Sequence, residues 1–526
     1  MNAALRPALP GIAIAVLTLA FACACALFVW QPTLATFADD SVSYLVMAQV
    51  FSPYQPASAA VAAAFAREAF YPPLFPLLLA LAGVAHHTAW AHALTALLLA
   101  ASVPLVYALG LRWFEDRRAA AAAALCVVLL PSLWVNAKGI LSEPLFCLLL
   151  LATFCAVDAS EKERNGIWLL GLLMAAMALT RTAALPMIAL YGLWALTRRG
   201  ATPASKARAA VPALAAFAAY AVWVLLRPGA TADNYARIVF EQAGAFLSEQ
   251  NPLAAIGASL LKQAHAVAEG WVGSLLLYWV EGRPLRAVLA GAVGGLAIAG
   301  MVLRLLAGKA DGWMMAGYLA VFIVWPFYDQ MGRFLFPVLP VLVLYAFLAA
   351  GAALRALGRP PVYGQGLLVA LVLSLTLPAL AFIHQRAQAP GRFTEIVDWY
   401  RTPALGEARA RAQVHLDLLA DMEEIRRLTR AEDRVMWVVP SYVALLAGRR
   451  GIAAPEPGLA SQAYRQAVRN SGADYVFLSR YHPRDTIRTL AWQAGTRALA
   501  DGAKVVHLRT QDGGSVVTSM LLKADK

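Results

Sequence analysis

Residues 11–30 read GIAIAVLTLAFACACALFVW and contain no charged side chain. A helix of about 20 apolar residues crosses the hydrocarbon core of a bilayer and satisfies its own backbone hydrogen bonds. This run therefore predicts a membrane span that follows Arg6. Further apolar runs follow at about 90–111, 119–136, 140–158, 166–181, 183–197, 209–226, 284–305, 312–327, 334–355 and 362–383. The sequence thus predicts a mainly α-helical, polytopic transmembrane bundle of about eleven spans.

The composition supports a membrane protein. Hydrophobic residues make up 60% of the 526 residues and charged residues 14%, against roughly 45–50% and 25% in soluble globular proteins. The formal net charge of +13 suggests nucleic-acid binding at first. The positive residues lie in short clusters between apolar runs, however, so we expect membrane lipids as partners and no nucleic acid. The five cysteines lie inside apolar segments, without disulfide or zinc spacing.

The basic residues predict the orientation of the spans. They cluster on alternate connections, namely Arg112–Arg118, Lys162–Arg164, Arg198–Arg208, Arg304–Lys309 and Arg355–Arg359. The positive-inside rule makes these connections cytoplasmic, which places the amino terminus inside and the carboxy-terminal region outside. Two loops, 31–88 and 227–283, then lie on the outer face. The first has an apolar stretch at 72–85 that is too short to span, and the second is amphipathic. We expect both to lie at the membrane surface.

The carboxy-terminal region differs in character from the rest of the chain. Its hydrophobic pattern predicts helices at about 405–430 and 442–447. The pattern also predicts strands at 435–439, 475–478, 505–508 and 516–521, with a turn at 512–514. We therefore divide the chain into a transmembrane domain, residues 1–384, and a small extracytoplasmic α/β domain, residues 385–526.

An acidic pair, Asp39-Asp40, follows the first span. Charged groups at a membrane boundary are costly and are therefore functional candidates. Two adjacent carboxylates repel each other, which can raise one pKa, and a carboxylate here can act as a general base or bind a cation. Asp40 can equally cap a helix over 41–50. Both interpretations remain open from the residues alone.

Three further charged groups fall at the same predicted face. Lys138 and Glu143 lie between two spans, where Glu143-Pro144 is also a favourable helix start. Arg181 lies between two short spans and can simply reach the interface. Arg333 heads a span that enters from outside. Its planar guanidinium suits a phosphate, with pairing to Asp329 as the structural alternative.

Several motifs in this order resemble the GT-C superfamily of integral-membrane glycosyltransferases. They are the acidic pair followed by Tyr44-Leu45, then Tyr71-Pro72-Pro73-Leu74, Ser142-Glu143-Pro144-Leu145-Phe146, Leu179-Thr180-Arg181 and the segment Arg333–Pro340. The resemblance covers about the first 385 residues. It is to the bacterial branch near the protein mannosyltransferases and the aminoarabinose lipid A transferases.

The resemblance implies transfer of a sugar, with inversion, from a polyprenyl phosphate or pyrophosphate to an acceptor hydroxyl. The reaction would take place at the periplasmic side of an inner membrane, and the acceptor would be a lipid, glycan or protein. Asp40 is then the expected base, with Asp39 as the alternative and Glu143 assisting. Arg333, Arg181 and Lys138 would stabilise the leaving phosphate, and Tyr44 and Tyr71 would contact substrate.

The sequence also departs from the family. Metal-dependent members carry a second acidic motif in another outer loop, which is missing here, so we expect no essential metal and no cofactor. Asp-Asp-Ser replaces the Asp-Glu pair of the aminoarabinose transferases. This difference weakens the inference that the chain uses the same substrate as those transferases. Two other functions remain possible: a transporter or flippase of a lipid-linked substrate, and a non-catalytic cell-envelope scaffold. A scaffold would tolerate Asp40→Asn, whereas an inverting transferase would not.

Overall fold

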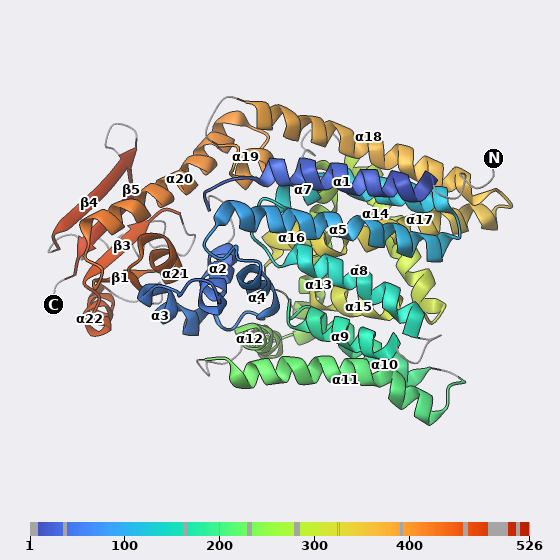
Figure 1. Cartoon of the computed structure of the whole chain (residues 1–526), viewed down its shortest axis with the longest axis horizontal. Helices are drawn as coiled ribbons and strands as arrows, with labels where there is room; N and C mark the ends of the chain where they lie inside the picture. Colours follow the sequence, from blue (N-terminus) through green and yellow to red (C-terminus); the bar gives the residue numbers. More distant parts are fainter. Residues whose placement is uncertain are drawn as a thin grey trace.

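The structure is a computed structural model. It describes residues 9–34, 39–160, 166–198, 200–228, 234–277, 284–322, 325, 327–389, 393–455, 461–481, 503–511 and 516–524. The predicted turn at 512–514 and the basic residues Lys162 and Arg164 lie outside these ranges. Within them the chain forms a long helical bundle with a small sheet domain at one end (Figure 1).

Apolar helices build the bundle. In the described part, six candidate spans are long and apolar enough to cross a membrane, at 11–29, 88–114, 203–226, 284–306, 328–356 and 361–388. They correspond to helices α1 (Leu9–Val29), α5 (Thr88–Phe114), α11 (Pro203–Leu226), α14 (Pro284–Leu306), α16–α17 (Met331–Leu335 and Leu339–Ala356) and α18 (Pro361–Gln388). Shorter helices lie among them, namely α6 (Arg117–Val128), α8 (Glu143–Ser160), α9 (Gly166–Ala178), α10 (Ala184–Thr197) and α15 (Ala310–Val321). The polytopic bundle is confirmed.

The run at 119–136 is not one continuous helix. Helix α6 ends at Val128, and a separate short helix, α7 (Pro131–Asn136), begins at Pro131. Proline lacks the backbone N–H that a continuing helix needs, and it is favoured at a first helical position. The break places the polar side chains of Ser132 and Asn136 in the interior.

The two predicted outer loops are helical. The first contains α2 (Asp39–Phe51), α3 (Ala59–Glu68) and α4 (Leu74–Leu81), and the second contains α12 (Asn234–Ser248) and α13 (Pro252–Leu276). Helices α2 to α4 lie between the bundle and the sheet domain, at the end opposite to the start of α1 (Figure 1). The α10–α11 and α17–α18 connections, which carry predicted cytoplasmic basic residues, lie at that other end.

The carboxy-terminal domain is α/β, as predicted. Helices α19 (Val397–Arg401) and α20 (Leu405–Leu428) lead into a five-stranded sheet of order β2-β1-β3-β5-β4. Strands β1 (Arg434–Trp437), β3 (Tyr475–Ser479), β4 (Val505–Gln511) and β5 (Val516–Lys523) match predicted strands. The prediction missed β2 (Arg450–Ala453) and α22 (Ser461–Ser471), and the helix at 442–447 is α21 (Pro440–Tyr442) continued by η4 (Val443–Ala447).

One apolar core joins the sheet domain to the outer helices. It contains Val42 and Met47 of α2, Phe75 of α4, and Trp437 and Val443 of the sheet domain. All five side chains are at most 1% exposed. The helix that carries Asp40 is therefore packed from one side by residues about 400 positions away in the chain.

Candidate active site

Asp40 lies in the first turn of α2, where the helix dipole favours a negative charge. Its Oδ1 accepts a hydrogen bond of 2.7 Å from the hydroxyl of Tyr71, and its Oδ2 pairs with Nη2 of Arg333. Burial raises the pKa of Asp40, but the charge of Arg333 and these two hydrogen bonds outweigh it, so the pKa is below its ordinary value. The suggestion that repulsion raises the pKa of one acid is wrong for Asp40. The side chain of Asp39 lies outside the described part.

Arg333 lies on the short helix α16 and joins two carboxylates. Besides Asp40, it donates from Nε to Oε1 of Glu143 over 2.7 Å. Its side chain is 8% exposed. The alternative in which Arg333 pairs with Asp329 is therefore wrong, because its guanidinium group pairs with Asp40 and Glu143 instead. Its third nitrogen, Nη1, has no hydrogen-bond partner among the described residues.

Glu143 opens helix α8 and lies between two arginines. Its Oε1 accepts from Arg333, and its Oε2 lies 2.9 Å from Nη1 of Arg181. The side chain has no exposed surface. A buried carboxylate of this kind requires such partners, because desolvation of an unpaired charge is very costly. In this geometry, Glu143 holds the two cations together.

Arg181 lies in the connection between α9 and α10 and points inward rather than toward the interface. Its side chain is 14% exposed, and Nη1 donates to Oγ of Ser142 over 3.0 Å. Its Nε is buried without a hydrogen-bond partner in the described structure. A donor left over on a buried guanidinium is a place for an anionic ligand.

Ser142 is the site residue that the sequence analysis did not single out. Its Oγ lies 2.8 Å from the hydroxyl of Tyr44, so it links α2 to Arg181. The Tyr44 ring makes edge contacts with Tyr71 and Phe75, at centroid distances of 5.2 and 5.1 Å. Of these rings, Tyr71 reaches the carboxylate of Asp40 through its hydroxyl. The only signal for Ser142 was its place in the Ser-Glu-Pro motif.

Lys138 is not part of this cluster. Its ammonium donates to the backbone oxygen of Phe28 over 2.8 Å and lies over the rings of Phe28 and Tyr400. Burial lowers the pKa of Lys138 to about 7, although the charge of nearby Glu395 acts in the opposite direction. These contacts join α1 to the segment that leads into the sheet domain. Nearby, the buried ring of His92 lies 3.1 Å from the side-chain amide of Gln31.

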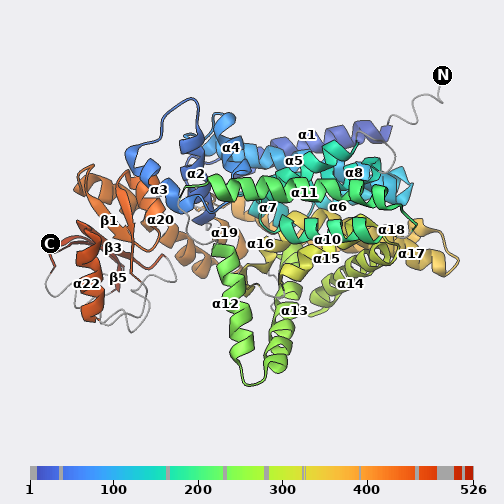
Figure 2. The ribbon, with the colours of Figure 1, turned by 90° about the horizontal axis from the view of Figure 1, so that it is seen from below.

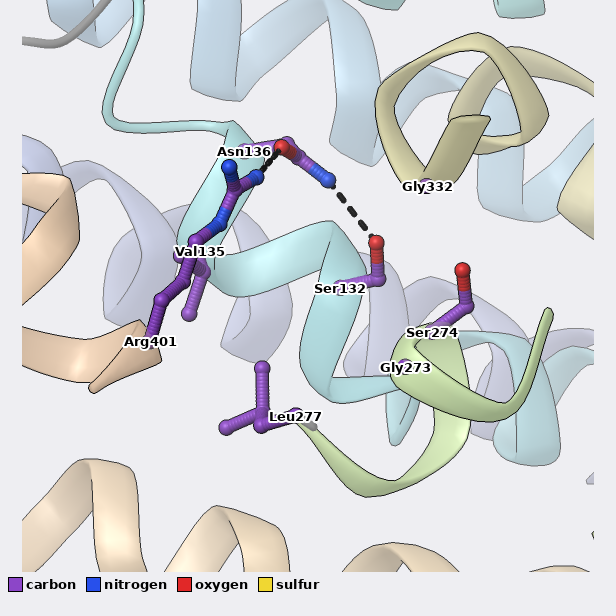
Figure 3. A pocket seen from close by; sticks show the side chains of 8 residues that line it. All are labelled: Ser132, Val135, Asn136, Gly273, Ser274, Leu277, Gly332 and Arg401. Atoms are coloured by element: carbon purple, nitrogen blue, oxygen red, sulfur yellow. Dashed lines mark hydrogen bonds between the residues drawn. The ribbon is translucent and has the colours of Figure 1, made fainter. Parts of the chain in front are cut away.

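A small polar pocket adjoins the cluster. It is lined by residues of α7, the end of α13, Gly332 beside Arg333, and Arg401 of α19 (Figure 3). Asn136 accepts from Arg401 and donates to Oγ of Ser132 over 2.8 Å. The pocket has room for about one water molecule, so it is not itself a sugar site.

The cluster gathers charged groups from four distant segments into one interior position. Asp40, Glu143, Arg181 and Arg333 are two acids and two bases, so the cluster is formally neutral. Asp40 is the most exposed of the four, at 23% of its side chain. In the part of the chain that is described, no group of three or more His, Cys, Asp or Glu side chains is placed to hold a metal ion.

Comparison with known proteins identifies one matching family. Residues 44–197 match the model of a family described as dolichyl-phosphate-mannose-protein mannosyltransferase. Residues 44–197 are thus similar to a glycosyltransferase family, within a chain that carries several candidate membrane spans. The family resemblance predicted from the sequence motifs is confirmed over this matched range, which includes Glu143 and Arg181. The match begins after Asp40 and ends before Arg333.

Solved structures that match the chain include two from Archaeoglobus fulgidus. Its oligosaccharyltransferase in the apo form is 13% identical, with 88% of this chain and 69% of that chain covered and a TM-score of 0.47. The same organism's AglB, with an inhibitory peptide and a dolichol-phosphate, is 13% identical, with 97% and 74% covered and a TM-score of 0.49. A search of curated proteins found no match.

Proposed function

We propose that the chain transfers a sugar, with inversion, from a polyprenyl phosphate or pyrophosphate to an acceptor hydroxyl at the outer face of the membrane. The observation that carries this proposal is the convergence of Asp40, Glu143, Arg181 and Arg333 at one end of the bundle. Four charged side chains are too costly to bury together for packing alone, and buried ionic groups at membrane depth mark function.

Asp40 suits the role of general base. The lowered pKa keeps it ionised at neutral pH, and its partial exposure leaves room for an acceptor hydroxyl. As the acceptor oxygen bonds to the anomeric carbon, its proton passes to Asp40 and the bond from that carbon to the phosphate oxygen breaks. Attack on the face opposite to the phosphate gives inversion.

The two arginines suit the leaving group. A departing phosphate carries its charge onto oxygen, and fixed guanidinium donors stabilise that charge without reorganisation. The leftover donors, Nη1 of Arg333 and Nε of Arg181, are the atoms that we assign to phosphate oxygens. Glu143 then acts as a positioning residue that holds both guanidinium groups, and Tyr44 and Tyr71 line the substrate side. Lys138 lies too far into the α1–α19 junction to share this task.

The experiment compares purified wild type with Asp40→Asn at equal protein amounts, using a radiolabelled polyprenyl-phosphate sugar and a membrane extract as acceptor source. We expect Asp40→Asn to abolish labelled product, because the amide cannot take the proton. Asp329→Asn is the matched control, since Asp329 is exposed and lies four residues before Arg333.

Product that persists in both Asp40→Asn and Asp39→Asn would refute the assignment of the base. The use of detergent-solubilised protein separates transfer from transport, because a flippase makes no new covalent product without a membrane to cross. A failure of wild type to form product with any lipid-linked sugar, together with movement of the intact donor across vesicles, would favour the transporter.

A further inference from the structure

Helices α12 and α13 form a hairpin that projects sideways from the bundle, across the direction of the long spans (Figure 2). Seven residues, 227–233, join it to the end of span α11, and seven more, 277–283, join it to the start of span α14. Both ends are thus tethered to the same membrane face. Because membrane spans run roughly along the membrane normal, a hairpin directed across them lies along the membrane surface.

Helix α13 has two distinct exposed faces. Leu253, Gly257, Leu260, Leu261, Ala264 and Ala268 recur at the spacing of a single helical face, and all are exposed. Lys262, His265 and Glu269 occupy another exposed face. The third face packs inward through Gln263, Ala266 and Gly270.

Helix α12 repeats this division over its described side chains. Phe240, Gly244 and Leu247 share one exposed face, with Phe240 at 75% and Leu247 at 74% exposure. Glu241 and Ser248 lie on the neighbouring exposed face. Leu253 and Leu261 of α13 are 82% and 75% exposed. Soluble proteins rarely expose such a row of large apolar side chains, whereas an interfacial helix requires one.

We propose that the apolar face of the α12–α13 hairpin is embedded in the lipid leaflet at the membrane face to which α11 and α14 tether it. The ends of those spans nearest the hairpin in sequence also expose apolar side chains, because Leu225, Leu226 and Leu285 are 82%, 76% and 69% exposed. The face with Lys262, His265 and Glu269 points to water or headgroups. This inference concerns the membrane contact and does not depend on the chemistry of the site.

The base of the hairpin contacts the segment that carries Arg333. A Cβ atom added at Gly270 would meet the backbone nitrogen of Gly332 at 2.8 Å, so α13 and α16 pack without any side chain between them. The amide of Gln263 also donates to the backbone oxygen of Trp325. A hairpin fixed in the leaflet therefore holds the Arg333 segment at a set depth relative to the lipid.

Fluorescence quenching in proteoliposomes tests this membrane contact. Leu261→Cys and Lys262→Cys are a matched pair, because the two positions are adjacent along α13, about 100° apart around its axis, and both exposed in the wild type. Each is labelled with an environment-sensitive NBD dye in a Cys23→Ala/Cys155→Ala background, which removes the cysteines that are not buried. The full chain is reconstituted at low protein-to-lipid ratio into phosphatidylcholine vesicles with or without doxyl-labelled lipid.

We expect doxyl lipid to quench the dye at position 261 strongly and the dye at 262 weakly, with the reverse order for aqueous iodide. Leu253→Cys, on the same face as Leu261 at the start of α13, should behave like Leu261→Cys. Equal access of iodide to positions 253, 261 and 262, with no doxyl quenching, would overturn the proposal and leave the face for a protein partner. Unchanged melting temperatures show that the labelled chains remain folded.

Discussion

Among single residues, Glu143 has both carboxylate oxygens within 2.9 Å of an arginine nitrogen and no exposed surface. Glu143→Gln removes the negative charge and leaves two buried guanidinium groups with Asp40 as their only carboxylate. Removing one partner from a buried ionic group typically costs about 3–5 kcal/mol. We expect Glu143→Gln to lower the thermal unfolding temperature in detergent clearly more than Asp40→Asn does. Equal stability of the two variants would contradict the positioning role.

The hydrogen bond from Tyr71 lowers the pKa of Asp40, in addition to the larger effect of the Arg333 charge. Asp40 acts as a base only when deprotonated, and wild type should keep its activity as the pH falls toward the ordinary aspartate range. Tyr71→Phe removes a hydrogen bond that lowers the pKa of Asp40, so the acid limb of kcat/KM should move to higher pH. The pH profile of purified enzyme measures this. Tyr54→Phe, whose hydroxyl instead donates to Leu81 outside the cluster, should leave the limb unchanged.

The charged site residues could be predicted individually from the sequence, but their partners could not. Asp40 and Arg333 stood out because a charge between apolar runs is costly. Their ion pair joins positions 293 residues apart, and no local pattern encodes such a contact. Lys138 satisfied the same rule as Arg181, yet its ammonium bonds to a backbone oxygen and to aromatic faces instead. Ser142, being uncharged, gave no comparable signal.

At the level of elements, hydropathy predicted the spans well. The side chains of a long membrane helix must be either buried in the protein or in contact with lipid along its whole length, so the helix is apolar throughout. Breaks within a run were harder to predict. Pro131 divides the run at 119–136, whereas Pro104 lies inside the continuous helix α5. The edge strand β2 was missed because four residues with a central Gly451 carry too little pattern. That glycine is required: a Cβ there would lie 2.1 Å from the oxygen of Pro440.

Close packing between helices α14 and α17 depends on one glycine. A Cβ atom at Gly300 would lie 2.0 Å from the backbone oxygen of Tyr345, whereas one at Gly295 of the same helix meets nothing within 4 Å. Overpacking of this kind typically costs about 1–3 kcal/mol. We expect Gly300→Ala to lower the melting temperature in detergent and Gly295→Ala to leave it unchanged or raise it, since alanine favours helix. Similar melting temperatures for the two variants would show that the close contact at Gly300 does not limit how α14 packs against α17.

For the whole molecule, the sheet domain and the outer helices share one core, so the site is coupled to a domain that contributes no charged group to the cluster. Val443 of η4 lies in that shared core and is fully buried, and η4 contacts α2 and α3. Val468 of α22, at 3% exposure, lies in a separate cluster confined to the sheet domain. The two valines are thus a matched pair for testing whether burial in the shared core supports α2.

Each Val→Ala change removes two buried methyl groups, worth about 2 kcal/mol with the cavity included. We expect Val443→Ala to speed amide hydrogen exchange in α2 to α4 and to reduce sugar transfer, because α2 positions Asp40. Val468→Ala should speed exchange only in the sheet domain and leave transfer near wild type. Hydrogen exchange followed by mass spectrometry distinguishes the two. If both variants loosen only the sheet domain, α2 depends on the bundle alone and the shared core does not hold the active site in place.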